Sequence, residues 1–119
     1  MTALELAEKI VGCIDAKKGE EIKLLDVHDR TTLCDYFVIA SGSSTPQLRA
    51  MADEIDEKLS ELGIDARRRA GGETADWLLL DYEMVIVHLS REEVREFYSL
   101  ERLWRDAQEV DISTIVKPN

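Results

Sequence analysis

The sequence has few cysteines and no long apolar run. Cys13 and Cys34 are its only cysteines, and they do not form a CxxC pair. Two cysteines cannot build a disulfide framework, so we expect both to be buried in a protein from a reducing compartment. No apolar run approaches the ~18 residues of a membrane-spanning helix. Because no basic or apolar leader is visible at the start, no signal peptide is expected and a cytoplasmic location is predicted.

Basic residues are also scarce. The chain has 15 lysines and arginines against 25 aspartates and glutamates, a net charge of −10. It has no basic arm, and its one basic run, residues 67–69, would alternate between the two faces of a strand. Binding to nucleic acid through phosphate contacts is therefore not expected. The acidic charge leaves two alternatives open, simple solubility and attraction to a basic protein partner.

Hydrophobic periodicity predicts one α/β domain in these 119 residues. The first helix is expected between a capping box at Thr2 and Glu5 and a stop at Gly19. A second is expected from a cap at Ser44 or Thr45 to about residue 62. Strands are expected at residues 22–27, 36–40, 64–69, 77–80 and 85–89. We expect the third strand to run parallel to the second, and the last two to form a hairpin.

The C-terminal part is predicted to be helical. Ser90 and Glu93 have capping-box spacing, and Ser99 can cap a last helix that continues to about Glu109. Residues 110–119 read as a frayed tail, which gives a single domain at 1–109. The expected fold is therefore a mixed sheet of about five strands with helices packed on it.

The turn at residues 41–44 is the first candidate for chemistry. It links a buried strand to a helix N-terminus, where free N–H groups can hold phosphate. A nucleotidyltransferase built on Gly42 and Ser43 would also need carboxylates for magnesium, and Asp81 and Glu83 are the nearest candidates. No P-loop lysine is present and no His or Cys pair stands at zinc spacing, so a plain strand-to-helix turn without metal is favoured.

Trp77 and Tyr82 are the second candidate. They flank a run of three leucines at the start of the predicted hairpin. Tryptophan and tyrosine often anchor protein interfaces, but periodicity alone leaves both a core role and an interface role open.

Four motifs in this order resemble the ribosomal silencing factor family, also called Iojap-related. They are DYFVIASGSS (residues 35–44), ADWLLLDY (75–82), VIVH (85–88) and REFYSLERLW (95–104). The resemblance extends from about Ala3 to Ala107. The Trp-hydrophobic-Asp-Tyr hairpin and the Phe-Tyr-x-Leu-Glu-x-Leu-Trp segment are its specific parts.

The resemblance implies a fold related to nucleotidyltransferases but without their catalytic carboxylates, and hence no enzymatic activity and no cofactor. It also implies binding to large ribosomal subunit protein fourteen, which blocks subunit joining and lowers translation when nutrients are scarce. The family's contact surface corresponds here to Trp77, Leu78, Asp81 and Tyr82. Trp77 is expected to anchor it, Leu78 and Tyr82 to add apolar contact, and Asp81 to meet a basic residue.

The chain departs from the family pattern at two places near this surface. Ala70-Gly71 stands where a Glu-Gly pair is common, and Glu83-Met84 stands where Gly-Asp is usual. A non-glycine residue is disfavoured in a type I′ or II′ turn, so another turn type is expected at the hairpin tip.

An apolar hairpin surface can also pair with a second copy, so a homodimer is a further expectation. A small magnesium-dependent nucleotidyltransferase remains the alternative function.

Overall fold

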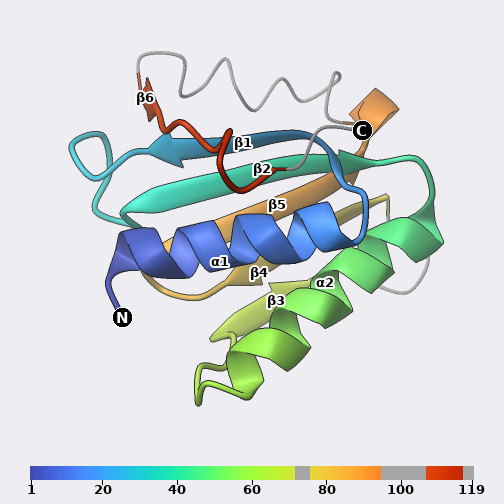
Figure 1. Cartoon of the computed structure of the whole chain (residues 1–119), viewed down its shortest axis with the longest axis horizontal. Coiled ribbons are helices and arrows are strands. Elements are labelled where there is room, and N and C mark those ends of the chain that lie inside the picture. Colours follow the sequence, from blue (N-terminus) through green and yellow to red (C-terminus); the bar gives the residue numbers. More distant parts are fainter. Residues whose placement is uncertain (72–75, 95–106, 117–119) are drawn as a thin grey trace.

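The computed structural model describes residues 1–71, 76–94 and 107–116. In chain order its elements are α1 (Ala3–Ala16), β1 (Glu20–Asp26), β2 (Tyr36–Gly42), α2 (Thr45–Ser60), β3 (Arg68–Ala70), β4 (Trp77–Asp81), β5 (Val85–Arg91) and β6 (Gln108–Glu109). The strands form one six-stranded sheet in the order β3-β4-β5-β2-β1-β6, and both helices lie against the same face of it (Figure 1). The predicted α/β class is confirmed.

The helix starts lie where the sequence predicts them, but α1 ends at Ala16, and the left-handed residue after it is Lys18, with φ +62°, rather than the predicted Gly19. Thr2 and Glu5 form the expected capping box at the start of α1. The Ser44 side chain caps α2 by accepting a hydrogen bond from the backbone N–H of Gln47 at 3.2 Å. Pro46 lies in the first turn of α2, where its missing N–H leaves no hydrogen bond unmade. Within the described residues, neither helix is long and apolar enough to cross a membrane.

The sheet is mixed, but its parallel pair differs from the predicted one. β2 pairs in parallel with β5, and the other neighbouring strands are antiparallel. β3 runs in the same direction as β2, yet β5 and β4 lie between them. The apolar run of β5 suits a central strand, whereas the arginines of β3 suit an edge that water can reach. β3 is also shorter than predicted, since residues 64–67 are not part of a strand.

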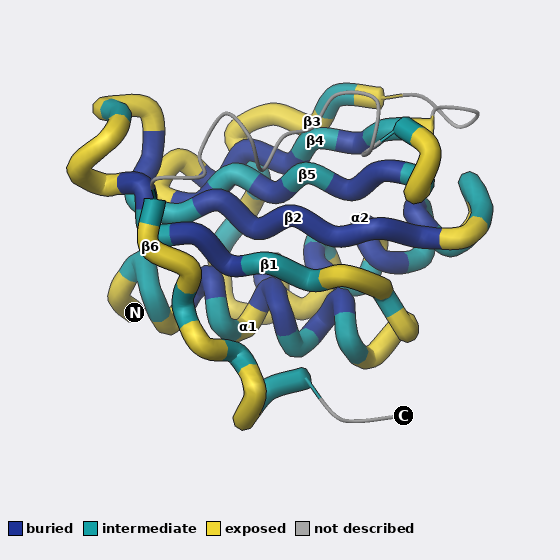
Figure 2. Tube along the Cα trace, turned by 90° about the horizontal axis from the view of Figure 1, so that it is seen from above, coloured by how far each residue is buried: buried dark blue, intermediate teal, exposed yellow. Residues whose placement is uncertain are grey.

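The core has two parts, one on each face of the sheet. The larger part lies between the sheet and both helices, and its most deeply buried side chains include Ile10, Met51 and Leu80. The smaller part lies on the opposite face and contains Leu25, Val27, Cys34, Phe37 and Ile39. β2 is buried along most of its length because both parts cover it (Figure 2). Cys13 and Cys34 are both buried and unpaired, as predicted.

The C-terminal region differs from the predicted helix and tail. The backbone is helical at 92–94, within the short helix predicted from Ser90. The end of that helix and most of the last helix predicted from Ser99, residues 95–106 in all, lie outside the described residues. Gln108–Glu109 form strand β6 against the edge of β1, where they satisfy backbone groups that a helix would leave open. Val110 donates its backbone N–H to Leu24 at 2.8 Å. The described part of the tail belongs to the domain, because four of its apolar residues pack on the larger core: Val110, Ile112, Ile115 and Val116.

Candidate protein-binding surface

The pleat of β4 separates the four predicted contact residues into two pairs. Leu78 and Tyr82 belong to the core beneath the helices, where they are 1% and 5% exposed. Successive side chains of a strand point to opposite faces, so Trp77 and Asp81 lie on the face away from the helices. The expectation that Leu78 and Tyr82 offer apolar contact to a partner therefore changes. Side chains so deeply buried present almost no surface.

Trp77 lies on a partly exposed apolar area at the start of β4. Its ring centroid is 6.1 Å from that of His88 on β5, and the His88 ring is 5.3 Å from that of Phe37. Leu79 pairs with His88 across the strands, and Asp81 pairs with Ile86. We call the partly exposed residues on this face the Trp77 surface; they are Trp77, Leu79, Ile86 and His88.

His88 keeps the Trp77 surface uncharged at neutral pH. Burial lowers the pKa of His88 to about 4, so its imidazole is neutral under physiological conditions. Its Nδ1 atom and the Ser90 hydroxyl, which lies two residues further along the same face, are buried without a hydrogen-bond partner among the described residues. Uncharged, partly exposed apolar side chains around a tryptophan are typical of the centre of a protein interface.

Asp81 is held by the hairpin itself. One carboxylate oxygen accepts the backbone N–H of Glu83 at 2.8 Å, and the other accepts the Arg67 guanidinium at 3.0 Å. Burial raises the pKa of Asp81, but the bond from Glu83 and the charge of Arg67 outweigh burial and hold that pKa below its usual range. The carboxylate is therefore charged, but its charge is already paired within the chain.

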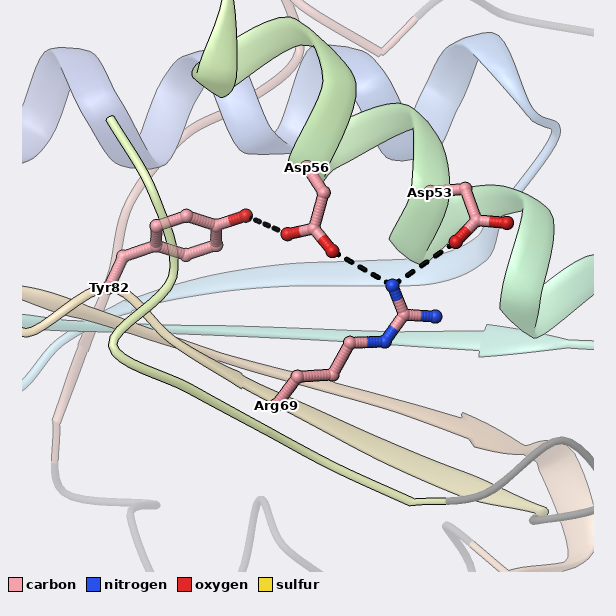
Figure 3. Close-up of polar contacts among 4 residues, drawn as sticks. All are labelled: Asp53, Asp56, Arg69 and Tyr82. Atoms are coloured by element: carbon pink, nitrogen blue, oxygen red, sulfur yellow. Dashed lines mark hydrogen bonds and ion pairs between the residues drawn. The ribbon is translucent and has the colours of Figure 1, made fainter. Parts of the chain in front are cut away.

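Tyr82 joins the hairpin to helix α2 (Figure 3). Its hydroxyl donates a short hydrogen bond to Asp56. The guanidinium of Arg69 donates to the same Asp56 at 2.8 Å and to Asp53 at 3.1 Å. Burial, followed by the bond to Asp56, raises the pKa of Tyr82 above its ordinary value. This network fixes the end of β4 against α2, so the role of Tyr82 in this arrangement is structural.

The turn at residues 41–44 is occupied by a side chain of the protein. Gln47 Oε1 accepts the backbone N–H of Ser43 at 2.7 Å and its hydroxyl at 3.1 Å. The Gln47 amide nitrogen in turn donates to the carbonyls of Lys17 and Lys18 at 3.2 and 3.0 Å. A phosphate would need the donor that Gln47 already uses. The plain strand-to-helix turn is therefore the better description of Gly42 and Ser43.

The strand register also separates Asp81 from that turn. Gly42 pairs with Arg91, whereas Asp81 pairs with Ile86, five residues earlier on β5. At roughly 3.3 Å per residue the separation is about 16 Å, too far for a shared magnesium ion. The predicted combination of Gly42, Ser43 and Asp81 is therefore wrong. Among the described residues, no group of three or more His, Cys, Asp or Glu side chains is placed to hold a metal ion.

Asp76 is the carboxylate that does lie near the turn. It accepts a hydrogen bond from Thr45 Oγ1 at 3.1 Å and lies 3.7 Å from the Arg91 guanidinium. No motif connects these three residues, so sequence reasoning missed them. Leu79 was missed as well, although the alternation of a strand already places it on the same face as Trp77.

Comparison with known proteins shows to which family the chain belongs. The family model described as "Ribosomal silencing factor during starvation" matches residues 1–119. This chain belongs to the ribosomal silencing factor family. The resemblance found in the four sequence motifs is thereby confirmed.

Individual proteins are similar to most or nearly all of the chain. "Ribosomal silencing factor RsfS" of Halalkalibacterium halodurans is 34% identical over 116 residues, which cover 98% of this chain and 99% of that protein. "Mitochondrial assembly of ribosomal large subunit protein 1" of Mus musculus is 31% identical over 82% of this chain and 44% of its own length. A crystal structure of a Chromobacterium violaceum protein superposes with a TM-score of 0.85 at 31% identity, covering 95% of this chain and 93% of that one.

Proposed function

We propose that this chain is a translational repressor without enzymatic activity. It binds large ribosomal subunit protein fourteen and blocks the joining of the two ribosomal subunits, so that translation falls when nutrients are limited. Membership of the ribosomal silencing factor family carries the proposal. The name of the mouse relative, which refers to assembly of the large subunit, also agrees with a partner on that subunit.

The Trp77 surface is the proposed contact. Trp77 supplies a large, partly exposed ring at the start of β4, and Leu79 extends the apolar area along the same face. Leu78 and Tyr82 contribute from the core side by holding the strand in place. Asp81 is charged but paired with Arg67, which is 59% exposed at its side chain. A basic residue of the partner can therefore share the Asp81 carboxylate when Arg67 turns toward water.

The net charge agrees with a basic protein partner. At −10 the chain is repelled by RNA phosphates in general and attracted to a basic patch of a ribosomal protein. Such attraction acts mainly on the rate of association, and salt screens it over about 10 Å at 0.1 M. Association with large subunits should therefore slow as salt is added, while the apolar contact of Trp77 governs dissociation.

The test is a subunit-joining assay with purified subunits. Large subunits are incubated with the protein, small subunits are added, and the fraction of joined ribosomes is measured by sedimentation. The proposal expects this fraction to fall as the protein is titrated, and expects isolated protein fourteen to compete for the repressor. Undiminished joining at saturating protein would contradict the proposed mechanism.

We do not favour the nucleotidyltransferase alternative. Gln47 fills the turn at Ser43, and Asp81 lies far from it. Calorimetric titration with ATP and magnesium is expected to show no binding to this turn.

A homodimer of the free protein stays a prediction, which sedimentation equilibrium at several protein concentrations can test.

A further inference from the structure

A second surface lies at the other end of β4, on the side of the sheet that the helices cover. A groove of about 640 Å³ opens between the tip of the β4–β5 hairpin, the loop after α2 and the start of α1. Its apolar lining includes Leu6, Leu62, Ile64 and Met84. Leu62 and Met84 are 47% and 41% exposed and rank among the few large apolar side chains that the described structure leaves in water. Exposed apolar groups gathered around one groove are typical of a docking site.

The rim of this groove is acidic. Asp65 and Glu83 both line it and both are exposed. No described residue forms an ion pair with either carboxylate: the nearby Arg67 is bonded to Asp81, and the charge of Glu83 acts on it only at longer range. A groove that is apolar inside and doubly acidic at its rim is complementary to an apolar side chain with cationic neighbours.

The backbone at the hairpin tip supports a role for Glu83. Glu83 has φ +71°, a positive value that is rare and strained for a non-glycine residue. The tip is closed by a hydrogen bond from the N–H of Met84 to the carbonyl of Tyr82 at 2.9 Å, so Glu83 lies at the centre of a γ-turn. Glycine would fit this position with less strain, yet the chain places a carboxylate there. Strain kept at a surface position is a pointer to function.

From these observations we propose that the groove binds a short segment of a partner protein in which one apolar side chain is flanked by lysine or arginine. The apolar side chain enters between Leu62 and Met84, and the cations meet Asp65 and Glu83. A second copy of this chain is a poor occupant, because it would bring the same two carboxylates to the contact. The groove lies apart from the Trp77 surface, so this site goes beyond the proposed ribosomal contact.

Amide chemical shifts of ¹⁵N-labelled protein can test the groove directly. The probe is a blocked peptide with the core Lys-Leu-Lys, and the matched probes replace either both lysines with glutamate or the leucine with serine. For so short a peptide we expect a dissociation constant on the order of 1 mM. The lysine–leucine peptide should shift the amides of Leu62, Ile64 and Met84. The glutamate peptide should not shift them, and the serine peptide should bind several-fold more weakly.

Charge-removing variants sharpen the test. Glu83→Gln and Asp65→Asn each keep the backbone and size of the residue, and each should weaken the lysine–leucine peptide about three- to fivefold. Glu92→Gln removes an exposed carboxylate at the far end of β5 and should change nothing. Trp77→Ala should also leave the titration unchanged, which separates this site from the ribosomal one.

Three results would overturn the groove proposal. The first is the absence of shifts at the groove with the lysine–leucine peptide, and the second is equal shifts with the glutamate peptide. The third is a change in the same amides with protein concentration alone, which would show that a second copy occupies the groove. None of these results bears on binding to large subunits, so the two proposals can fail separately.

Discussion

Replacing Tyr82 with phenylalanine removes one hydroxyl from the network at the end of β4. That hydroxyl donates to Asp56, and the Tyr82 ring, which is 5% exposed, stays in place. A hydrogen bond to a charged group contributes about 1.5–3 kcal/mol to the free energy of unfolding. The Asp56 side chain is 32% exposed, so water can replace the lost donor in part. We therefore expect Tyr82→Phe to lower stability by about 1.5 kcal/mol, the lower end of that range.

Urea unfolding followed by circular dichroism measures this loss. The midpoint should fall while the dependence on urea stays the same, and the melting temperature should drop by about 6 °C. Tyr36→Phe is the matched control. Tyr36 is partly exposed, and no described residue bonds to its hydroxyl, so this variant should stay within about 0.5 kcal/mol of the wild type.

The pH dependence of the same pair of proteins isolates the hydroxyl. Burial and the bond to Asp56 raise the pKa of Tyr82 in the folded state. In the unfolded chain the phenol releases its proton near pH 10, so the stabilisation is complete below about pH 10 and is lost above it. The loss approaches 1.4 kcal/mol per pH unit, and Tyr82→Phe lacks it. The stability gap between wild type and variant should therefore narrow as the pH rises above 10.

Two results would refute the assigned role of Tyr82. One is a stability change below about 0.5 kcal/mol at neutral pH. The other is a gap that stays constant as the pH is raised through the titration of the phenol. Either result would mean that the hydroxyl does not join the hairpin to α2.

Three further predictions concern the hairpin and the loop before it. Gly71→Ala should lower the free energy of unfolding by at least about 2 kcal/mol, because φ is +106° and a Cβ would lie 2.5 Å from the Trp77 carbonyl oxygen. Gly63→Ala is the control: φ is also positive there, but nothing lies near the added Cβ, so the loss of stability should be smaller. Asp81→Asn should lower the free energy of unfolding by about 1 kcal/mol at neutral pH. In urea titrations this difference should start to shrink below about pH 4, where the unfolded carboxyl takes up a proton, and should disappear only as the pH falls through the lowered folded-state pKa. Glu83→Gly should raise the melting temperature by a few degrees by relieving about 1 kcal/mol of backbone strain, and a lower melting temperature would contradict the γ-turn.

The sequence predicts the elements that have strong local signals. It does not predict features that depend on contacts between residues far apart in the chain. The capping box at Thr2 and the apolar run of β2 are local, and both are found where they are predicted. The pairing of β2 with β5 depends on which strand can be buried on both faces, and that choice involves the whole sheet. The sequence predicts a helix through the residues of β6, because nothing in their own sequence shows the open edge of β1 that they cover.

In the candidate surface, too, local features are predictable from the sequence and contacts between distant residues are not. The Trp77 motif predicts a strand that the structure contains as β4, and the period of two could have shown that Leu78 points away from Trp77. The sequence could not show that Tyr82 bonds to Asp56, or that Gln47 closes the turn at Ser43. Such contacts join residues from different elements, so they follow only from the packed fold.

Binding of Trp77→Ala to purified large ribosomal subunits tests the central claim most directly. Leu33→Ala is the matched control, because Leu33 is another exposed large apolar residue, 68% exposed in the loop after β1. Sedimentation should show Trp77→Ala binding about 30-fold more weakly than wild type, or about 2 kcal/mol, with its circular dichroism unchanged. Leu33→Ala should bind as the wild type does. Equal binding by folded Trp77→Ala and wild-type protein would contradict the Trp77 surface as the ribosomal contact.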